Sequence, residues 1–335
     1  MRIAIDAMGG DFAPQAVLEG VKLVLPELTK DAEIILYGDE AALQKGLAGL
    51  GVSDARIRLV ATTEVIGFDE QPTLAIRKKK DSSMVRAIES VANGEADCVL
   101  SAGSTGALLT GATLIIKRLK GVKRPALATV LPTLDSCALL LDCGANTDCK
   151  SDYLVQFAIM GSAYMKSVFG VEHPRVGLLN NGTEEEKGNE LTKEAHALLK
   201  TAPVRFTGNC EARDVLGGEF DVVVCDGFDG NIVLKGTEGT ASLMMNLLKR
   251  SLMMNFRTKM GALLCKPAFK QLKKKLDYTE YGGAPLLGVN GGVIKAHGSS
   301  NAKAFRSAIL QGVKLISSNA TALLGEQIAQ LVTEE

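Results

Sequence analysis

The sequence has no excess charge of either sign and no long hydrophobic run. Its 335 residues carry 38 basic and 38 acidic side chains, so the formal net charge is zero. A protein that binds nucleic acid through bulk positive charge is therefore excluded. No stretch approaches the roughly 18 apolar residues of a membrane-spanning helix, and Asp6 interrupts the N-terminal run where a signal peptide needs apolar residues. We expect a chain that stays in the cytosol.

The usual signatures of cofactor, metal and disulfide chemistry are also missing. The seven cysteines form no C-x-x-C pair and have no nearby histidine to complete a zinc site, so we interpret them as reduced core residues. The sequence has no G-x-x-x-x-G-K-[ST], G-x-G-x-x-G, H-E-x-x-H or G-x-S-x-G motif. The absence of these motifs argues against an ATP-binding protein, an NAD-binding protein, a zinc protease and a serine hydrolase. We expect neither a resident metal nor a cofactor.

The composition and the hydrophobic pattern predict a large α/β protein. Hydrophobic residues make up 46% of the chain and charged residues 23%, which is typical of a globular protein with a sizeable core. Short β-rich runs alternate with helical patterns, and this order predicts βαβ units around a largely parallel sheet. Runs that are apolar at every position, such as Ala138–Leu141, suit strands covered by helices on both faces. We predict a three-layer α/β/α sandwich that forms a single catalytic domain over residues 1–335.

The predicted strands are Arg2–Asp6, Glu33–Tyr37, Arg56–Ala61, Asp97–Leu100, Ala126–Leu131, Ala138–Asp142, Arg175–Leu179, Val204–Thr207 and Asp221–Cys225. The predicted helices are Pro14–Leu25, Ser82–Asn93, Gly106–Leu119, Ser151–Phe169, Asn189–Thr201 and Ala302–Leu324.

A basic segment departs from this pattern. Between Lys249 and Lys275 there are nine basic residues and no acidic one. Apolar residues recur there at i+4 spacing, which predicts an amphipathic helical arm over residues 243–278. An ordinary solvated helix face is the simplest interpretation, but an anionic membrane, an acidic protein partner or a dimer contact would also use such a surface. The residues of this surface are Leu248, Leu252, Phe256, Met260 and Leu264 on the apolar side and Arg257, Lys259, Lys266 and Lys270 among the basic ones.

A turn rich in small residues follows the predicted strand Asp97–Leu100. It reads Ser101-Ala102-Gly103-Ser104-Thr105-Gly106 and leads into a predicted helix. Backbone N–H groups at a helix start, beside two hydroxyls, can bind phosphate without a formal cation. Ser104 or Thr105 alone would suffice to cap the helix. The additional Gly103 and Gly106 favour a phosphate contact.

Carboxylate and amide side chains follow three other predicted strands. Asp-Gly and Gly-Asn pairs are ordinary turn formers, so each turn taken alone is a weak signal. Open α/β sheets bind ligands at the carboxyl ends of their strands, and the repetition of such turns at one sheet edge therefore predicts a polar pocket. The neighbouring run Glu184–Glu186 is most simply a solvated loop, with a metal role as the minor alternative. The residues concerned are Asn146 after Ala138–Asp142, Asn180 and Asn181 after Arg175–Leu179, and Asp226, Asp229 and Asn231 after Asp221–Cys225.

His297 is the one of three histidines that is placed to do chemistry. It lies in the sequence Lys295-Ala296-His297-Gly298-Ser299-Ser300, just before a predicted helix. A fixed Lys295 can neutralise an anion while His297 moves a proton, and Ser299 or Ser300 can cap the helix. A structural histidine beside a helix cap is the alternative.

Taken together, these motifs resemble the PlsX family of bacterial phosphate acyltransferases over nearly the whole chain. The resemblance implies an isopropylmalate-dehydrogenase-like fold and transfer of a fatty acyl group from acyl-acyl-carrier protein to inorganic phosphate. It also implies a homodimer that associates peripherally with the membrane, where a glycerol-3-phosphate acyltransferase would use the acyl phosphate for phospholipid synthesis. Many relatives carry His after the Gly-Gly-Asp, whereas Phe12 stands here, so no proton transfer is available at that position. The motifs in register are Asp6–Asp11, Arg77–Ser83, Ser101–Gly106, Asn180–Glu190, Gly227–Asn231, Tyr281–Ala284 and Lys295–Ser300.

In this reaction phosphate is itself the nucleophile, so the protein has to position reactants and stabilise charge. Three alternatives remain open: a phosphotransacetylase that uses acyl-coenzyme A, a metal- and NAD-dependent decarboxylating dehydrogenase, and a noncatalytic scaffold that recruits lipid-synthesis proteins to membranes. Asp226 or Asp229 is expected to orient hydrogen-bond donors. The residues expected to position phosphate are Lys295, His297, Ser104, Thr105 and Asn180, with Gly103, Gly106 and Ser299 beside them, and the expected pocket residues are Asp6, Asn146, Asn181 and Asn231.

Overall fold

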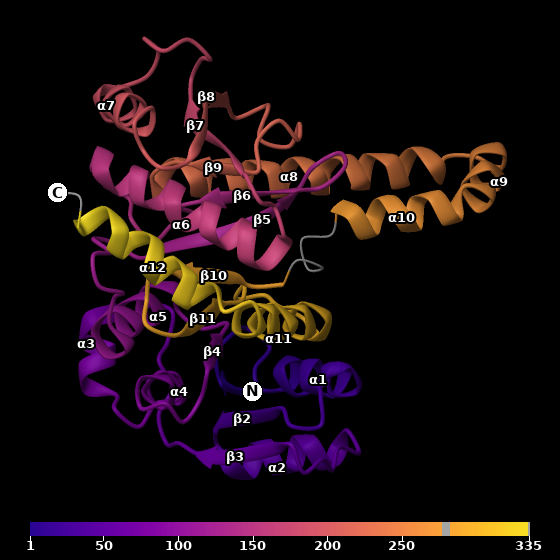
Figure 1. The fold of residues 1–335 in the computed structure, drawn as a ribbon. Coiled ribbons are helices and arrows are strands. Elements are labelled where there is room, and N and C mark those ends of the chain that lie inside the picture. Colours follow the sequence, from indigo (N-terminus) through magenta and orange to yellow (C-terminus); the bar gives the residue numbers. More distant parts are fainter. Residues whose placement is uncertain (277–281, 334–335) are drawn as a thin grey trace.

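The computed structural model describes residues 1–276 and 282–333, and its centre is one sheet of 11 strands (Figure 1). The strand order is β3-β2-β1-β4-β11-β10-β5-β6-β9-β7-β8. The strands are β1 (Arg2–Asp6), β2 (Glu33–Gly38), β3 (Ile57–Ala61), β4 (Cys98–Ser101), β5 (Ala126–Pro132), β6 (Cys137–Leu141), β7 (Arg175–Asn180), β8 (Arg205–Glu211), β9 (Val222–Val224), β10 (Ala284–Leu287) and β11 (Gly292–Lys295). The α-helices are α1 (Gln15–Val24), α2 (Glu40–Gly49), α3 (Pro72–Lys78), α4 (Ser83–Ala92), α5 (Thr105–Gly111), α6 (Ser151–Phe169), α7 (Glu190–Leu199), α8 (Gly227–Leu252), α9 (Phe256–Leu264), α10 (Lys266–Leu276), α11 (Ala302–Ser317) and α12 (Ala320–Thr333).

The sheet consists of two parallel groups of strands that run in opposite directions. β1, β2, β3, β4 and β11 form one group, and β6, β7, β8 and β9 form the other. Between them, β10 pairs antiparallel with β11 and with β5, and β5 pairs antiparallel with β6. The expectation of a largely parallel sheet therefore holds within each group. The expectation that all polar turns meet at one sheet edge is wrong, because the strands of the two groups end at opposite edges.

Helices cover both faces of the sheet, which confirms the three-layer α/β/α sandwich. Successive residues of β1 point to opposite faces: Ile3 and Ile5 belong to one core cluster, and Ala4 belongs to another. The first cluster includes side chains from α1, α2, α6, α7, α11 and α12, whereas the second includes side chains from α3, α4 and α5. A third cluster packs between β6, β9 and the start of α8. Helices α1 and α11 approach each other closely, because a Cβ at Gly20 would lie 2.4 Å from Cβ of Phe305.

All nine strands predicted from the sequence are present, but two strands, two helices and the first half of α8 were not predicted. β10 and β11 have only four residues each and are flanked by glycines, so their hydrophobic pattern is too short to recognise. The helices α2 and α3 were likewise missed. The predicted helix Ala302–Leu324 is two helices, α11 and α12, because Asn319 adopts a φ of 53° and ends the first one.

The helical arm is present but is not one continuous amphipathic helix. It consists of the second half of α8 followed by α9 and α10, which project from the body as a hairpin (Figure 1). Asn255 accepts a hydrogen bond from the Thr258 backbone N–H at 3.0 Å and starts a new helix, so Leu252 and Phe256 do not lie on one helical face. The arm's predicted boundary 243–278 includes residues 277 and 278, which lie outside the described residues. Among the helices of the described residues, none is long and apolar enough to cross a membrane.

Candidate active site

Three adjacent strands of the first group bring the main polar cluster together. β1, β4 and β11 are parallel neighbours, and Lys295 at the end of β11 is in register with Ser101 at the end of β4. Asp6 ends β1 at the same edge. Residues separated by almost the whole chain therefore meet because parallel strands end together.

Asp6 is buried beneath this edge, with 1% of its surface exposed. Its carboxylate accepts hydrogen bonds from the hydroxyls of Ser83 at 2.6 Å and Ser101 at 2.7 Å. Burial raises the pKa of Asp6 above its usual range, and the two hydroxyl donors oppose that rise. A Cβ at Gly9 would lie 2.4 Å from the Asp6 carboxylate, so only glycine lets the turn after β1 fold over it. Asp6, expected to line the pocket, is instead a buried support below it.

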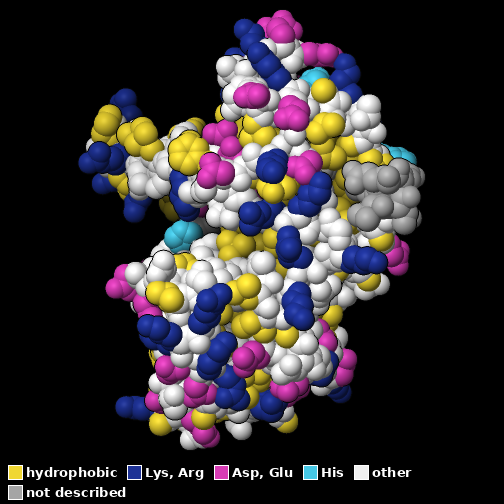
Figure 2. Space-filling model, turned by 90° about the vertical axis from the view of Figure 1, so that its left-hand side faces the viewer, with side chains coloured by type: hydrophobic (Ala, Val, Ile, Leu, Met, Phe, Trp, Pro, Cys, Tyr) yellow, Lys and Arg dark blue, Asp and Glu magenta, His cyan; other side chains and the backbone are white. Residues whose placement is uncertain are grey.

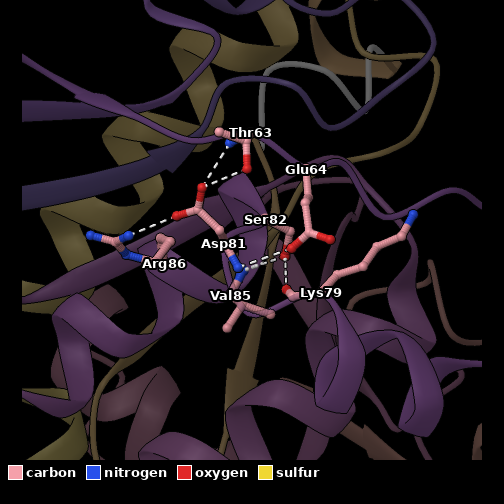
Figure 3. Close-up of polar contacts among 7 residues, drawn as sticks. All are labelled: Thr63, Glu64, Lys79, Asp81, Ser82, Val85 and Arg86. Carbon is pink, nitrogen blue, oxygen red and sulfur yellow. Dashed lines mark hydrogen bonds and ion pairs between the residues drawn. The ribbon is translucent and has the colours of Figure 1, made fainter.

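Polar contacts of Asp81 and Ser82 fix the loop before α4 (Figure 3). Ser82 caps α4, because its hydroxyl accepts a hydrogen bond from the Val85 backbone N–H at 3.3 Å. Asp81 ties this turn to the preceding loop by accepting from the Thr63 hydroxyl at 2.7 Å. The capped helix start therefore presents Ser83 to the buried carboxylate.

Lys295 lies beside Asp6 and is almost fully buried, with 9% of its surface exposed. Burial lowers the pKa of Lys295 from 10.5 to about 8, although the charges of Asp6 and Asp11 act in the opposite direction. Its ammonium group donates a hydrogen bond to the carbonyl oxygen of Ala296. Burying this ammonium group therefore makes the folded state less stable. Side chains with a strongly shifted pKa are common at functional sites.

His297 lies above Lys295 on the surface and meets a lysine from the opposite group of strands. Its Nδ1 is 2.8 Å from the Ser299 hydroxyl and accepts from the Ser299 backbone N–H at 3.2 Å. Its Nε2 is 3.4 Å from Nζ of Lys235 in α8. Partial burial and then the charge of Lys235 lower the pKa of His297, so the neutral imidazole is favoured at pH 7. Lys235 also pairs with Glu238 at 2.8 Å.

The turn after β4 lies next to this cluster. The Gly103 backbone N–H donates to the Ser101 hydroxyl at 3.0 Å, and Ser104 caps α5 by accepting from the Ala107 backbone N–H at 3.4 Å. The capping role of Ser104 is confirmed, and the phosphate contact proposed for this turn stays a prediction. Gly106 has a packing reason of its own, since a Cβ there would lie 2.7 Å from Cγ of Pro72 in α3.

A second polar cluster forms where β6 and β9 of the other group end. Asp142 is fully buried and accepts from the backbone N–H of Leu127 at 2.9 Å and of Asn146 at 2.7 Å. The Asn146 side chain donates to Asp142 and to the Pro125 carbonyl, so its amide N–H groups have partners within the fold. Asp226 caps α8 by accepting from the Asp229 backbone N–H at 2.8 Å, and burial raises its pKa. These residues position the start of α8.

Asn180 and Asn181 lie apart from the Lys295 cluster. The Asn180 side chain donates to the Lys187 carbonyl at 3.2 Å and accepts from the Asn181 backbone N–H at 2.8 Å, so it braces its own loop. β7 is five strand positions from β11, which places Asn180 on the order of 24 Å across the sheet from Lys295. The structure therefore does not bring Asn180 together with Lys295 and His297.

Helix α8 connects the two clusters. It begins at Gly227 after the capping residue Asp226, and Asp229 and Asn231 are exposed near its start. About 12 Å farther along its axis it carries Lys235 to His297. The sequence reasoning missed Lys235 and also Asp11, whose backbone N–H donates to the Gly298 carbonyl at 2.8 Å. The available signal was that Lys235 is the first basic residue after the Asp226–Asn231 turn.

The cysteines are unsuited to act as nucleophiles in this region. Six of the seven lie wholly or partly within the fold, and burial raises the pKa of each of these thiols. A raised pKa disfavours the reactive thiolate. Cys265, the exposed one, lies at the end of α9 in the arm.

Comparisons with solved structures identify the fold. A phosphotransacetylase from Streptococcus pyogenes matches with a TM-score of 0.62 and 16% identity, over 95% of this chain and 94% of that one. A 4-hydroxythreonine-4-phosphate dehydrogenase from Klebsiella pneumoniae matches with a TM-score of 0.53 and 14% identity, over 94% of this chain and 98% of that one. Because these identities are low, the similarity shows a shared fold and no more.

Sequence comparisons identify the family. The model of the family described as fatty acid synthesis protein matches residues 1–323. A phosphate acyltransferase from Caldanaerobacter subterraneus subsp. tengcongensis is 51% identical over 98% of this chain and 97% of its own length. The phosphate acyltransferase from Thermoanaerobacter pseudethanolicus is 50% identical over 100% of this chain and 99% of its own length. The chain therefore belongs to the fatty acid synthesis protein family and, within it, to the phosphate acyltransferases.

Proposed function

We propose that this protein transfers a fatty acyl group from acyl-acyl-carrier protein to inorganic phosphate. The observation that carries the proposal is the pairing of Lys235 with His297 above the buried Lys295. Two nitrogen groups that can both donate hydrogen bonds lie 3.4 Å apart on an accessible surface. An anion oxygen that bridges them from the outer side would accept from both, which offsets the cost of holding them together.

The chemistry requires no covalent enzyme intermediate. A phosphate oxygen attacks the thioester carbonyl carbon, the carbonyl electron pair moves to oxygen, and the tetrahedral oxyanion then expels the carrier-protein thiolate. The products are acyl phosphate and the carrier-protein thiol, which takes its proton from water or from the site. Because a thiolate is a good leaving group, positioning and charge stabilisation supply the main catalytic effects.

The hydrogen bonds of His297 assign its role. Since Nδ1 accepts from the Ser299 backbone N–H, we infer that the neutral ring carries its proton on Nε2. The Nε2–H group then donates toward phosphate or the oxyanion, beside the Lys235 ammonium. Lys295, held by its buried surroundings near Asp6, adds positive potential from below, and Ser104 and Thr105 border the site from the turn after β4.

The test is phosphate-dependent release of carrier protein from purified hexadecanoyl-acyl-carrier protein, with acyl phosphate identified by mass spectrometry. Hexadecanoyl-coenzyme A is assayed in parallel. Acyl phosphate from the carrier-protein thioester is the expected result. A preference for the coenzyme A thioester would instead indicate a phosphotransacetylase, and no acyl phosphate from folded protein would favour a noncatalytic scaffold.

We further propose that residues 1–335 form one catalytic unit with the arm inserted, and that the arm serves association. Phe256 and Leu264 are 78% and 79% exposed there, and Figure 2 shows hydrophobic and basic side chains gathered at the arm's tip. Such a surface suits an anionic membrane, the acidic carrier protein or a second copy in a homodimer. The enzyme would then work in the cytoplasm at the membrane surface, where a glycerol-3-phosphate acyltransferase consumes the acyl phosphate for phospholipid synthesis.

This association is tested with Phe256→Glu and Leu264→Glu, using sedimentation with vesicles that contain anionic lipid and sedimentation equilibrium without them. Loss of vesicle binding by a protein of unchanged mass supports membrane contact. A change of mass alone assigns the arm to the dimer.

A further inference from the structure

We propose that Glu238 is a positioning residue whose carboxylate holds the Lys235 ammonium group beside His297, so that the anion site is formed before phosphate binds. This inference rests on the proposed function and adds to it the group that keeps the cationic pair together. Glu238 lies in α8, three residues after Lys235, and the two side chains form an ion pair at 2.8 Å. Glu238 itself makes and breaks no bond in the reaction, because it acts through Lys235.

Glu238 lies toward the side of α8 that packs on the protein body. It follows Leu234 by four residues, and Leu234 packs against the core cluster between β6 and β9. Residues three or four positions apart in a helix are neighbours, so Glu238 is adjacent to both Leu234 and Lys235. The Glu238 side chain is 26% exposed, whereas the Lys235 side chain is 48% exposed. The helix backbone therefore fixes a partly buried carboxylate from which the longer and more exposed lysine side chain can be held.

The ion pair involves these two side chains and no third one. Nζ of Lys235 donates to Oε2 of Glu238 at 2.8 Å. In the part of the chain that the structure describes, Glu238 pairs with no other cation and Lys235 pairs with no other carboxylate. A lysine side chain has several rotatable bonds, and it loses their freedom when it is held in one place. The Glu238 carboxylate offsets part of that loss and favours the rotamer that reaches His297.

Lys235 needs such a partner because its contact with His297 is not attractive by itself. Nζ of Lys235 lies 3.4 Å from Nε2 of His297. Since Nδ1 accepts from the Ser299 backbone N–H, the neutral ring carries its proton on Nε2. An ammonium group and an Nε2–H group are both donors, so they form no hydrogen bond with each other. The Glu238 carboxylate keeps Lys235 beside the ring until an anion oxygen accepts from both donors.

Glu238 also belongs to the set of charged groups that act on His297. Lys235 and Glu238 face the ring from α8. Lys295 acts on it from the end of β11, and Asp11 acts on it from the turn after β1. Partial burial and the two lysines lower the pKa of His297, whereas the two carboxylates raise it. Removing the charge of Glu238 should therefore lower the pKa of His297, and removing the charge of Lys235 should raise it.

The experiment measures KM for phosphate and the titration of His297 in Glu238→Ala and Glu238→Gln, each with and without Lys235→Gln. KM is measured with hexadecanoyl-acyl-carrier protein at a saturating concentration. The chain has three histidines, so proton NMR can follow each imidazole, and the signal of His297 is the one that is missing in His297→Asn. Glu172→Ala is the matched control, because Glu172 pairs with Lys166 at 2.9 Å after the end of α6. Alanine and glutamine both favour helix, so we expect the Glu238 variants to fold.

Glu238→Ala should raise KM for phosphate about twofold to fivefold, which is the range expected for a partly exposed ion pair. Glu238→Gln should keep most of the phosphate affinity, since its amide oxygen still accepts from Lys235. It should lower the pKa of His297 and move the acidic limb of the pH–rate profile to lower pH. In the Lys235→Gln background, Glu238→Ala should leave KM unchanged, because the group through which Glu238 acts is gone. Glu172→Ala should change neither KM nor the titration.

Three results would overturn the inference. An equal rise in KM from Glu238→Ala with and without Lys235 would show that the carboxylate acts on something other than this lysine. A lower KM in Glu238→Ala would show that the carboxylate repels phosphate. An unchanged pKa of His297 in Glu238→Gln would show that the carboxylate does not act on the ring. Failure of the proposed function is distinct from these results: wild-type protein would then make no acyl phosphate from hexadecanoyl-acyl-carrier protein or hexadecanoyl-coenzyme A, while the NMR titration would still report the effect of Glu238 on His297.

Discussion

Replacing Lys295 with methionine should stabilise the fold while it removes activity. Methionine has nearly the length of lysine but carries no charge, so it tests what the buried ammonium costs. The pKa of Lys295 is lowered from 10.5 to about 8. A pKa difference of this size corresponds to about 3 kcal/mol, which the folded protein gives up to keep the amine protonated at pH 7. The free energy of unfolding of Lys295→Met should therefore exceed that of the wild type by up to about 3 kcal/mol at pH 7.

The advantage of the variant should depend on pH in a defined window. Between about pH 8 and pH 10.5 the unfolded wild-type chain keeps the Lys295 proton while the folded chain has lost it, so wild-type stability rises with pH there relative to the variant. The gain from Lys295→Met should be largest below pH 8 and should vanish as the pH approaches 10.5.

Urea denaturation of both proteins at a series of pH values measures this difference, and Lys45→Met on the exposed side of α2 is the control. The control should show a small difference that does not vary with pH. A Lys295→Met protein no more stable than the wild type at pH 7, or a gain that persists unchanged at high pH, would refute the reasoning.

Three further changes test the site and its support. Lys235→Gln should raise KM for phosphate about tenfold or more, since a hydrogen bond to a charged group contributes about 1.5–3 kcal/mol. It should also move the acidic limb of the pH–rate profile to higher pH, because the Lys235 charge lowers the pKa of His297. An unchanged KM and an unchanged profile in steady-state kinetics would contradict this. Ser83→Ala removes one of two hydroxyls that donate to Asp6, so urea denaturation should show a loss of about 1–3 kcal/mol, and wild-type stability would exclude that supporting role. Gly20→Ala should cost about 1–3 kcal/mol in the same assay, because the added Cβ collides with Phe305, and a neutral effect would mean that α1 and α11 can separate freely.

The sequence by itself determined the local elements and identified several residues of the candidate site. Apolar runs and alternating patterns identify β1 to β9 because burial on one or both faces constrains every position of a strand. The helix start at Ser82 and the turn after β4 were recognisable, since capping and tight turns depend on residues close together in the chain. The Lys295–Ser299 motif was recognisable as a candidate site from its residue types alone.

Tertiary structure alone decided which of these elements meet. The direction of a strand depends on pairing with distant segments, so local patterns could not predict the antiparallel pairing of β10 and β5, which sets the two groups in opposite directions. For the same reason Asn180 was expected beside Lys295, whereas the fold separates them by five strand positions. Lys235 shows the converse, because an ordinary helical lysine becomes part of the site only where α8 crosses from one group of strands to His297 of the other. The packing of the sheet brings together segments far apart in the sequence. These contacts determine which site residues lie near one another, and the individual motifs carry no information about that.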